Sequence, residues 1–171
     1  MSSIIIRLAT KHDIESLLRM PPYSRGCIVF PFEEDILVAE RDGDVVGVIS
    51  VGHRDTNYVS GEWKDSYEHC LNAVLKKVSS CWISKLYVLP EHRCQGIGTT
   101  LVKRAVRFLK ERGFTEAYAS IYIKNEFRET SRRIFEGNGF DEIGSCICRL
   151  SQGYCRGTLL RCTLRSSDGE G

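Results

Sequence analysis

The chain lacks the features that mark a membrane protein. No apolar run approaches the roughly 20 residues that a helix needs to cross a bilayer. The segment from Met1 to Arg7 also has no basic stretch followed by a long apolar core, so we expect a first strand there and no signal peptide. The sequence therefore predicts a cytoplasmic protein with no membrane partner.

An excess of charge of one sign is also missing. The chain has 24 Lys and Arg residues against 22 Asp and Glu residues, a formal net charge of +2. Nucleic-acid-binding domains are usually strongly basic, so we expect no nucleic-acid partner. The length of 171 residues and the hydrophobic fraction of 42% are those of one globular domain. We expect this domain over residues 1–165 and a disordered tail over 166–171.

Eight cysteines are present, but none of them forms a zinc motif. There is no Cys-x-x-Cys pair and no cysteine and histidine cluster with the spacing of metal ligands, so we expect no metal. We interpret most cysteines as small buried hydrophobic residues. The alternative is one or two disulfides, for example Cys146 with Cys162 across a C-terminal hairpin.

Hydrophobic periodicity and turn signals predict alternating strands and helices. Residues 54–80 form a polar, helix-leaning insert that is longer than a hairpin needs. The order of elements is typical of an α/β domain with a mixed sheet covered by helices. The predicted strands are 4–8, 36–40, 45–51, 81–88, 115–123, 140–150 and 158–164, and the predicted helices are 10–18, 99–112 and one that ends near 136.

The segment from Leu86 to Val102 carries the strongest chemical signal. It passes from an apolar strand through a turn into the start of a helix, where backbone N–H groups lack intrahelical partners and favour an anion. Gly96 and Gly98 let a phosphate approach the backbone, and Arg93 adds a positive charge. The segment therefore predicts a diphosphate site. It is not a P-loop, because no lysine follows the glycines.

These residues resemble a known family over about residues 4–164, the GCN5-related N-acetyltransferases (GNAT). The resemblance implies a twisted, mostly antiparallel sheet of about seven strands with flanking helices, splayed between the fourth and fifth strands. It also implies an acyl-CoA donor, normally acetyl-CoA, and an amine acceptor. The pattern that carries it is Leu86-x-Val88-x-Pro90-x-x-Arg93-x-x-Gly96-x-Gly98, a helix, a strand, Asn125, and Phe135-Glu136-x-x-Gly139-Phe140.

The resemblance assigns the coenzyme contacts to three parts of the chain. The backbone of the strand at Leu86, Tyr87 and Val88 would face the acetyl carbonyl and the pantetheine arm, which Asn125 would also contact. The spacing from Asn125 to Gly139 is about three residues longer than usual, so Arg128 is an alternative for that role. The diphosphate would be held by Arg93, Cys94, Gln95, Gly96, Ile97, Gly98 and Thr99.

The usual general acid and base of the family are both missing. Ser84 and Lys85 stand where many relatives have an acidic residue, and Phe135 stands where many have a tyrosine. Tyr122 is a candidate acid, against the alternative of a packed strand aromatic. Glu126 is a candidate base, against the alternative of a solvated loop charge.

Two functions remain open on this sequence. The first is an N-acetyltransferase that moves an acetyl group from acetyl-CoA directly to an amine of a small molecule or a peptide. The second is a catalytically weak or inactive domain that senses acyl-CoA.

An amine acceptor is a cation, so carboxylates should line its groove, and the insert 54–80 is our choice for the specificity element. The chain is expected to be a monomer or a homodimer. The candidate carboxylates are Glu33, Glu34 and Asp35, and in the insert Glu62, Asp65 and Glu68.

Overall fold

The computed structural model describes residues 3–22, 34–52, 80–122, 126–150 and 153–164. Three of the sequence predictions lie outside these residues: almost all of the 54–80 insert, the position of Asn125, and the tail 166–171. All elements of the fold below come from the described residues.

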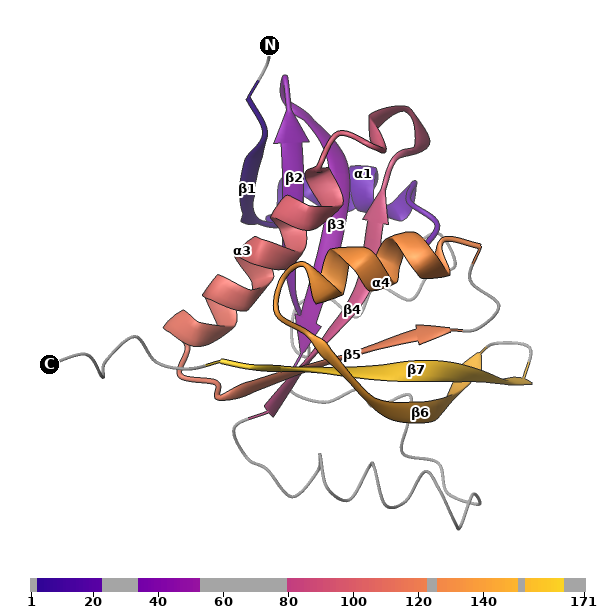
Figure 1. Ribbon diagram of the computed structural model, residues 1–171. Coiled ribbons are helices and arrows are strands. Elements are labelled where there is room, and N and C mark those ends of the chain that lie inside the picture. The colour runs from indigo at the N-terminus through magenta and orange to yellow at the C-terminus, as the bar shows by residue number, and fades with distance from the viewer. Residues whose placement is uncertain (1–2, 23–33, 53–79, 123–125, 151–152, 165–171) are drawn as a thin grey trace, which may run out of the picture.

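Seven strands form one sheet in the order β1-β2-β3-β4-β5-β7-β6 (Figure 1). Every neighbouring pair is antiparallel except β4 with β5, which is parallel. The predicted mixed, mostly antiparallel sheet is therefore confirmed. The strands are β1 (Ile5–Leu8), β2 (Glu34–Arg41), β3 (Asp44–Gly52), β4 (Ser80–Val88), β5 (Glu116–Tyr122), β6 (Asp141–Leu150) and β7 (Gly153–Thr163).

The β2–β3 hairpin turns where the sequence predicts. Asp42 and Gly43 both have positive φ, 55° and 89°, as a two-residue turn of this hand requires. β2 begins earlier than predicted, at Glu34. Glu34 and Asp35 are therefore strand residues, paired with Gly52 and Val51, so the predicted start of this strand at residue 36 was wrong.

The sheet splits between β4 and β5. Their parallel pairing runs only from Ser80 opposite Glu116 to Ile83 opposite Ala119. Just beyond Ile83, β4 carries an extra residue relative to β3, and Lys85 there has a φ of 52°. Such a bulge bends a strand and increases its twist. Figure 1 shows the outcome: the alternating strands β1 to β4 lie along one axis, while β5, β7 and β6 lie across them. The predicted splay is confirmed.

Two helices, α3 (Ile97–Glu111) and α4 (Arg128–Glu136), cover one face of the sheet (Figure 1). α3 begins two residues before the predicted helix, and it ends before Gly113, whose φ is 81°, as expected of a helix C-terminus. The main core lies under these helices. The buried residues of α3 are Ile97, Leu101, Val102, Ala105, Phe108 and Leu109.

A smaller core lies on the other face, under a short 3-10 turn η1 (Lys11–Asp13) and α1 (Ile14–Leu18). Leu17 and Met20 are almost fully buried and pack with Val38 and Val48. A capping box closes the start of this segment: the Asp13 carboxylate accepts from the backbone N–H of Thr10, and the Thr10 hydroxyl accepts from the backbone N–H of Asp13.

The C-terminal hairpin shows that the suggested Cys146–Cys162 disulfide was wrong. The strands turn between Leu150 and Gly153, so Cys146 lies opposite Gly157. Cys162 is five residues further along β7, about 16 Å at the rise of a strand, whereas a disulfide needs Cα atoms closer than about 7 Å. Cys162 is a buried free thiol, as is Cys81.

In the described ranges no helix is both long enough and apolar enough to span a membrane. In the same ranges no three side chains of the metal-ligating types His, Cys, Asp and Glu come together.

A partly buried ion-pair cluster joins β1, η1 and β2. Arg7 donates from Nη1 and Nη2 to the two carboxylate oxygens of Asp13, each at 2.8 Å, and from Nε to Glu40 at 2.7 Å. Asp13 also accepts from the backbone N–H of Thr10 at 2.7 Å and is only 5% exposed. The hydrogen bonds from Arg7, more than any other contact, lower the pKa of Asp13 from 3.8 to about 2.

This ion pair should contribute stability that acid removes. Because the pKa of Asp13 is lower in the folded chain, its contribution is complete above about pH 4 and is lost as the pH falls to about 2. We expect Asp13→Asn to reduce the free energy of unfolding at pH 7 by about 2 kcal/mol and to flatten its decline in acid, measured by urea denaturation. Glu15→Gln, which removes an exposed pair with Arg19, is the control and should change little. An unchanged acid profile in Asp13→Asn would contradict this assignment.

Candidate functional site

The loop between β4 and α3 is anchored to the sheet at its start. The backbone N–H of Leu89 donates to Val46 of β3 at 2.9 Å. A 3-10 turn, η3 (Pro90–His92), follows and is closed by bonds from His92 to Leu89 and from Arg93 to Pro90. The loop therefore leaves β4 in a fixed direction.

The backbone N–H groups of residues 94–99 have no hydrogen-bond partner among the described residues. Cys94 and Gly96 have positive φ, 59° and 76°, and helix α3 makes its first bond only from Thr100 to Gly96, at 3.0 Å. Successive amides in such a loop form a concave surface for an anion, and the positive end of the α3 dipole adds to it. The diphosphate cradle predicted from the sequence thus has the right backbone geometry.

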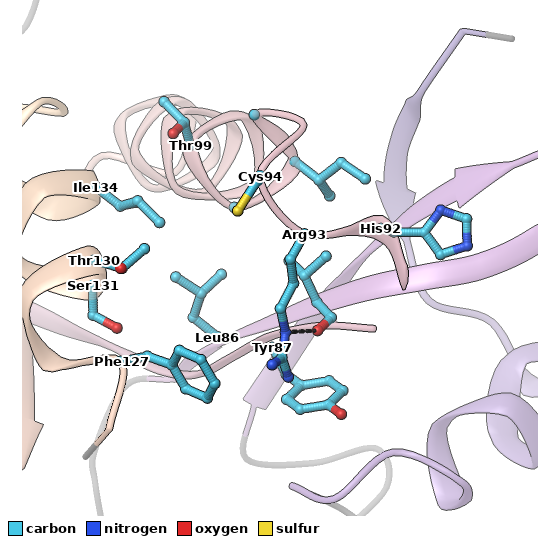
Figure 2. Close-up of a pocket in the computed structure, with 14 residues that line it drawn as sticks. Leu86, Tyr87, His92, Arg93, Cys94, Thr99, Phe127, Thr130, Ser131 and Ile134 are labelled. Atoms are coloured by element: carbon cyan, nitrogen blue, oxygen red, sulfur yellow. Dashed lines mark hydrogen bonds between the residues drawn. The ribbon is translucent and has the colours of Figure 1, made fainter. Parts of the chain in front are cut away.

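These amides open into a cavity of about 630 Å³ between the β4 segment, the loop and α4 (Figure 2). A volume of this order suits a small organic ligand. The cavity is lined by Leu86, Tyr87, Val88, His92, Arg93, Cys94, Gly96, Ile97, Gly98, Thr99, Phe127, Thr130, Ser131 and Ile134.

Most residues predicted to contact the coenzyme come together in this cavity, and two do not. Gln95 does not line it: its side-chain oxygen accepts from Arg41 at 2.6 Å and its amide donates to Glu91 at 3.2 Å. Asn125 lies outside the described residues. The predicted residues that the cavity brings together are Leu86, Tyr87, Val88, Arg93, Cys94, Gly96, Ile97, Gly98 and Thr99.

Gly98 allows α4 to approach the start of α3. A Cβ added at Gly98 would lie 3.2 Å from Cδ1 of Ile134 and 4.0 Å from a methyl group of Val88. The first distance is shorter than a normal carbon contact, so a larger residue would require the Ile134 side chain to shift by a few tenths of an ångström. Gly98 therefore allows close packing between the start of α3 and α4.

The α4 wall of the cavity was missed by the sequence analysis. Its residues Phe127, Thr130, Ser131 and Ile134 follow the spacing i, i+3, i+4 and i+7, which places them on one face of a helix. In Figure 2 these side chains lie opposite the β4 residues Leu86 and Tyr87. The sequence contains this spacing, but two of the four positions are polar, so the pattern differs from the apolar stripe of a packed helix.

Arg93 bridges the two walls of the cavity. Its Nε donates to the carbonyl of Val88 at 2.9 Å. Its guanidinium lies 4.5 Å from the ring centroid of Phe127 and 5.5 Å from that of Tyr87 (Figure 2). Arg93 thereby holds a positive charge inside the cavity, close to the unpaired amides.

The described residues supply few groups for proton transfer. Phe135, at the position of the usual acid, has no ionisable group. Its ring is 5% exposed and packs edge-on against Phe140, with ring centroids 5.1 Å apart. Glu126 is exposed, precedes α4 and does not line the cavity. Tyr122 ends β5, its backbone opposite Gly157, and its side chain lies outside the described part.

Tyr118, on the same face of β5 as Tyr122, has a structural role. Its ring packs on Trp82 with centroids 5.8 Å apart, and its hydroxyl donates to Glu116 at 2.9 Å. Burial, followed by the contact with Glu116, raises the pKa of Tyr118 to about 12. A phenol with this pKa is a poor acid near neutral pH.

Two other charged candidates bond elsewhere. Arg128, the alternative to Asn125, donates to the hydroxyl of Thr158 on β7 at 3.5 Å and does not line the cavity. Asp35, a candidate acceptor-binding carboxylate, forms an ion pair with Arg112 just after α3. Glu33, the side chain of Glu34, and the insert carboxylates Glu62, Asp65 and Glu68 lie outside the described residues.

Comparison with known proteins points to one family. Residues 10–140 match the pattern of the acetyltransferase (GNAT) family. An uncharacterized N-acetyltransferase of Archaeoglobus fulgidus is 36% identical over 80 residues, which are 47% of this chain and 44% of that protein. The chain thus matches less than half the length of this relative.

Solved structures of low sequence identity share the fold. A probable acetyltransferase from Staphylococcus epidermidis superposes with a TM-score of 0.69 at 12% identity, over 95% of this chain and 100% of that one. A putative acetyltransferase from Salmonella typhimurium, solved with its cofactor acetyl-CoA, gives a TM-score of 0.66 at 17% identity over 99% of both chains.

The stacking of Arg93 on Phe127 should be measurable as an energetic coupling. We expect a double-mutant cycle of Arg93→Ala and Phe127→Leu, followed by urea denaturation, to give a coupling of about 0.5–1 kcal/mol. The same cycle with Arg133→Ala, an arginine on the exposed face of α4, should be additive. If the effects of Arg93→Ala and Phe127→Leu were also additive, the contact between these two side chains would contribute nothing to the free energy of unfolding.

Proposed function

The chain belongs to the acetyltransferase (GNAT) family, and we propose that it transfers an acetyl group from acetyl-CoA directly to an amine. The observation that carries this proposal is the row of amides at residues 94–99, which have no partner in the described part of the chain and lie at the head of a cavity of about 630 Å³. A diphosphate needs such donors, and the pantetheine arm needs such a cavity.

The cavity fits coenzyme A in two respects. The amides of residues 94–99 and the charge of Arg93 suit its diphosphate. β4 loses its parallel partner beyond Ile83. Backbone groups of Leu86 to Val88 on that side, apart from the Val88 carbonyl that accepts from Arg93, are therefore available to amide groups of the pantetheine arm. Phe127 and Ile134 supply apolar contact from the opposite wall.

The split strand also offers a means of activating the thioester. Acetyl-CoA supplies a reactive acyl carbon and a thiolate leaving group. A free β4 N–H donates to the carbonyl oxygen and stabilises the negative charge that develops when the amine attacks. We propose Glu126 as the base that accepts the proton of the amine, and Tyr122 as the acid that protonates the thiolate, because the usual positions hold Ser84 and Phe135.

The acceptor is an amine of a small molecule or of a peptide. We propose that the insert 54–80 selects it, and that the protein works in the cytoplasm as a monomer or a homodimer without a metal. A second function, an acyl-CoA sensor without turnover, is supported by the absence of an ionisable group at Phe135.

Gly96→Glu should abolish most of the binding of coenzyme A. Space for a side chain exists at Gly96, but a carboxylate there would face the diphosphate. We expect the Kd to rise about 100-fold or more, because like charges at close range cost several kcal/mol. Isothermal titration calorimetry measures this change.

Gly113→Glu is the matched control. Gly113 also has positive φ, 81°, and open space around it, but it lies at the far end of α3. Both variants should lose similar stability from backbone strain, whereas only Gly96→Glu should lose affinity. Equal affinity in the two variants would show that the loop does not hold the diphosphate.

Turnover separates the enzyme from the sensor. We expect release of free CoA thiol from acetyl-CoA, above hydrolysis, with at least one amine of a panel of polyamines, lysine peptides, N-terminal peptides and small metabolites. Tyr122→Phe and Glu126→Gln should each lower kcat about 10-fold or more, by the usual worth of acid and base catalysis. Tight binding of acetyl-CoA without turnover on the whole panel would favour the sensor.

A further inference from the structure

The helices beside the cavity carry many cations, and half of them are paired with carboxylates. These arginines lie on α3 or α4, or just after α3, and bond to carboxylates of the same helix or of a neighbouring strand. The pairs are Arg104 and Arg107 with Glu111, Arg112 with Asp35, and Arg132 with Glu136 and Glu142.

The other four form no ion pair with a carboxylate in the part of the chain that the structure describes. Arg128 is half-buried and donates to the hydroxyl of Thr158. Lys103, Lys110 and Arg133 are exposed. Lys103 follows Thr99 by four residues and so shares its face of α3. Since Thr99 lines the cavity, Lys103 lies about 6 Å along the helix from the cavity's edge.

Arg133 approaches the same end of the cavity from α4. It precedes Ile134, whose side chain lies against Gly98 at the start of α3. Helix geometry turns Arg133 about 100° away from Ile134, and its exposure shows that this direction is the solvent side. Two cations without carboxylate partners therefore flank the diphosphate end of the cavity, one on each helix.

Coenzyme A carries a further phosphate near its diphosphate, on the 3′ position of the ribose. We propose that Lys103 and Arg133 bind this 3′-phosphate and make the protein prefer coenzyme A to 3′-dephospho-CoA. The inference rests on the proposed function, because it requires the diphosphate to lie on the amides of residues 94–99. A phosphate monoester has a charge of about −1.5 to −2 at pH 7, which suits two cations.

The test compares two ligands that differ only in the 3′-phosphate. Calorimetry should give the wild type about a 10-fold lower Kd for CoA than for 3′-dephospho-CoA, the value expected of one good charge-assisted contact. Lys103→Ala and Arg133→Ala should each reduce this ratio to about 3-fold, and the double variant should remove it. The Kd for 3′-dephospho-CoA should stay constant in all variants.

Lys110→Ala is the matched control, because Lys110 lies on the same face of α3 about 10 Å further from Thr99. It should keep the full ratio, and Lys103→Arg should keep most of it. A wild type that binds both ligands equally would overturn the inference, as would a ratio that survives in the double variant. Failure of both ligands to bind would instead show that the diphosphate site, and with it the proposed function, is wrong.

Discussion

The divergence of β4 from β5 is the constraint on which the rest of the structure depends. Pairing ends at Ile83 and Ala119, and the bulge at Lys85, with its positive φ, turns the end of β4 away from its neighbour. Unpaired strand backbone is costly in a protein core, unless a ligand or solvent occupies the gap. The cavity beside Leu86 and Val88 follows directly from this split.

The same strand also positions the loop proposed to bind the diphosphate. β4 leads into a loop that Leu89 ties to β3, and the loop delivers the start of α3 to the head of the cavity. The positive φ of Gly96 turns the backbone just before α3, and Gly98 leaves room for Ile134 of α4 on the opposite wall. Backbone conformation, more than side-chain chemistry, therefore builds the site, which explains how the chain can lack a familiar acid and base.

The sequence predicted the elements and the glycine loop before α3 well because both depend on local features. Asp42 and Gly43 specify their turn by themselves, and the glycines before α3 specify a close backbone approach. Contacts between distant segments were not predictable. Gln95 turns toward Arg41 because the β2–β3 hairpin passes behind the loop, and the α4 face that begins at Phe127 becomes a wall only when α4 packs beside α3.

Amide hydrogen exchange tests the central claim most directly, because it reports on the backbone N–H groups of residues 94–99 themselves. These amides have no partner among the described residues and should exchange rapidly in the free protein. Saturation with coenzyme A should slow exchange about 10-fold or more at residues 94–99, while the amides of β1 and β6, which lie at the two edges of the sheet, stay unchanged. Unchanged exchange at residues 94–99 in a protein saturated with coenzyme A would contradict the account.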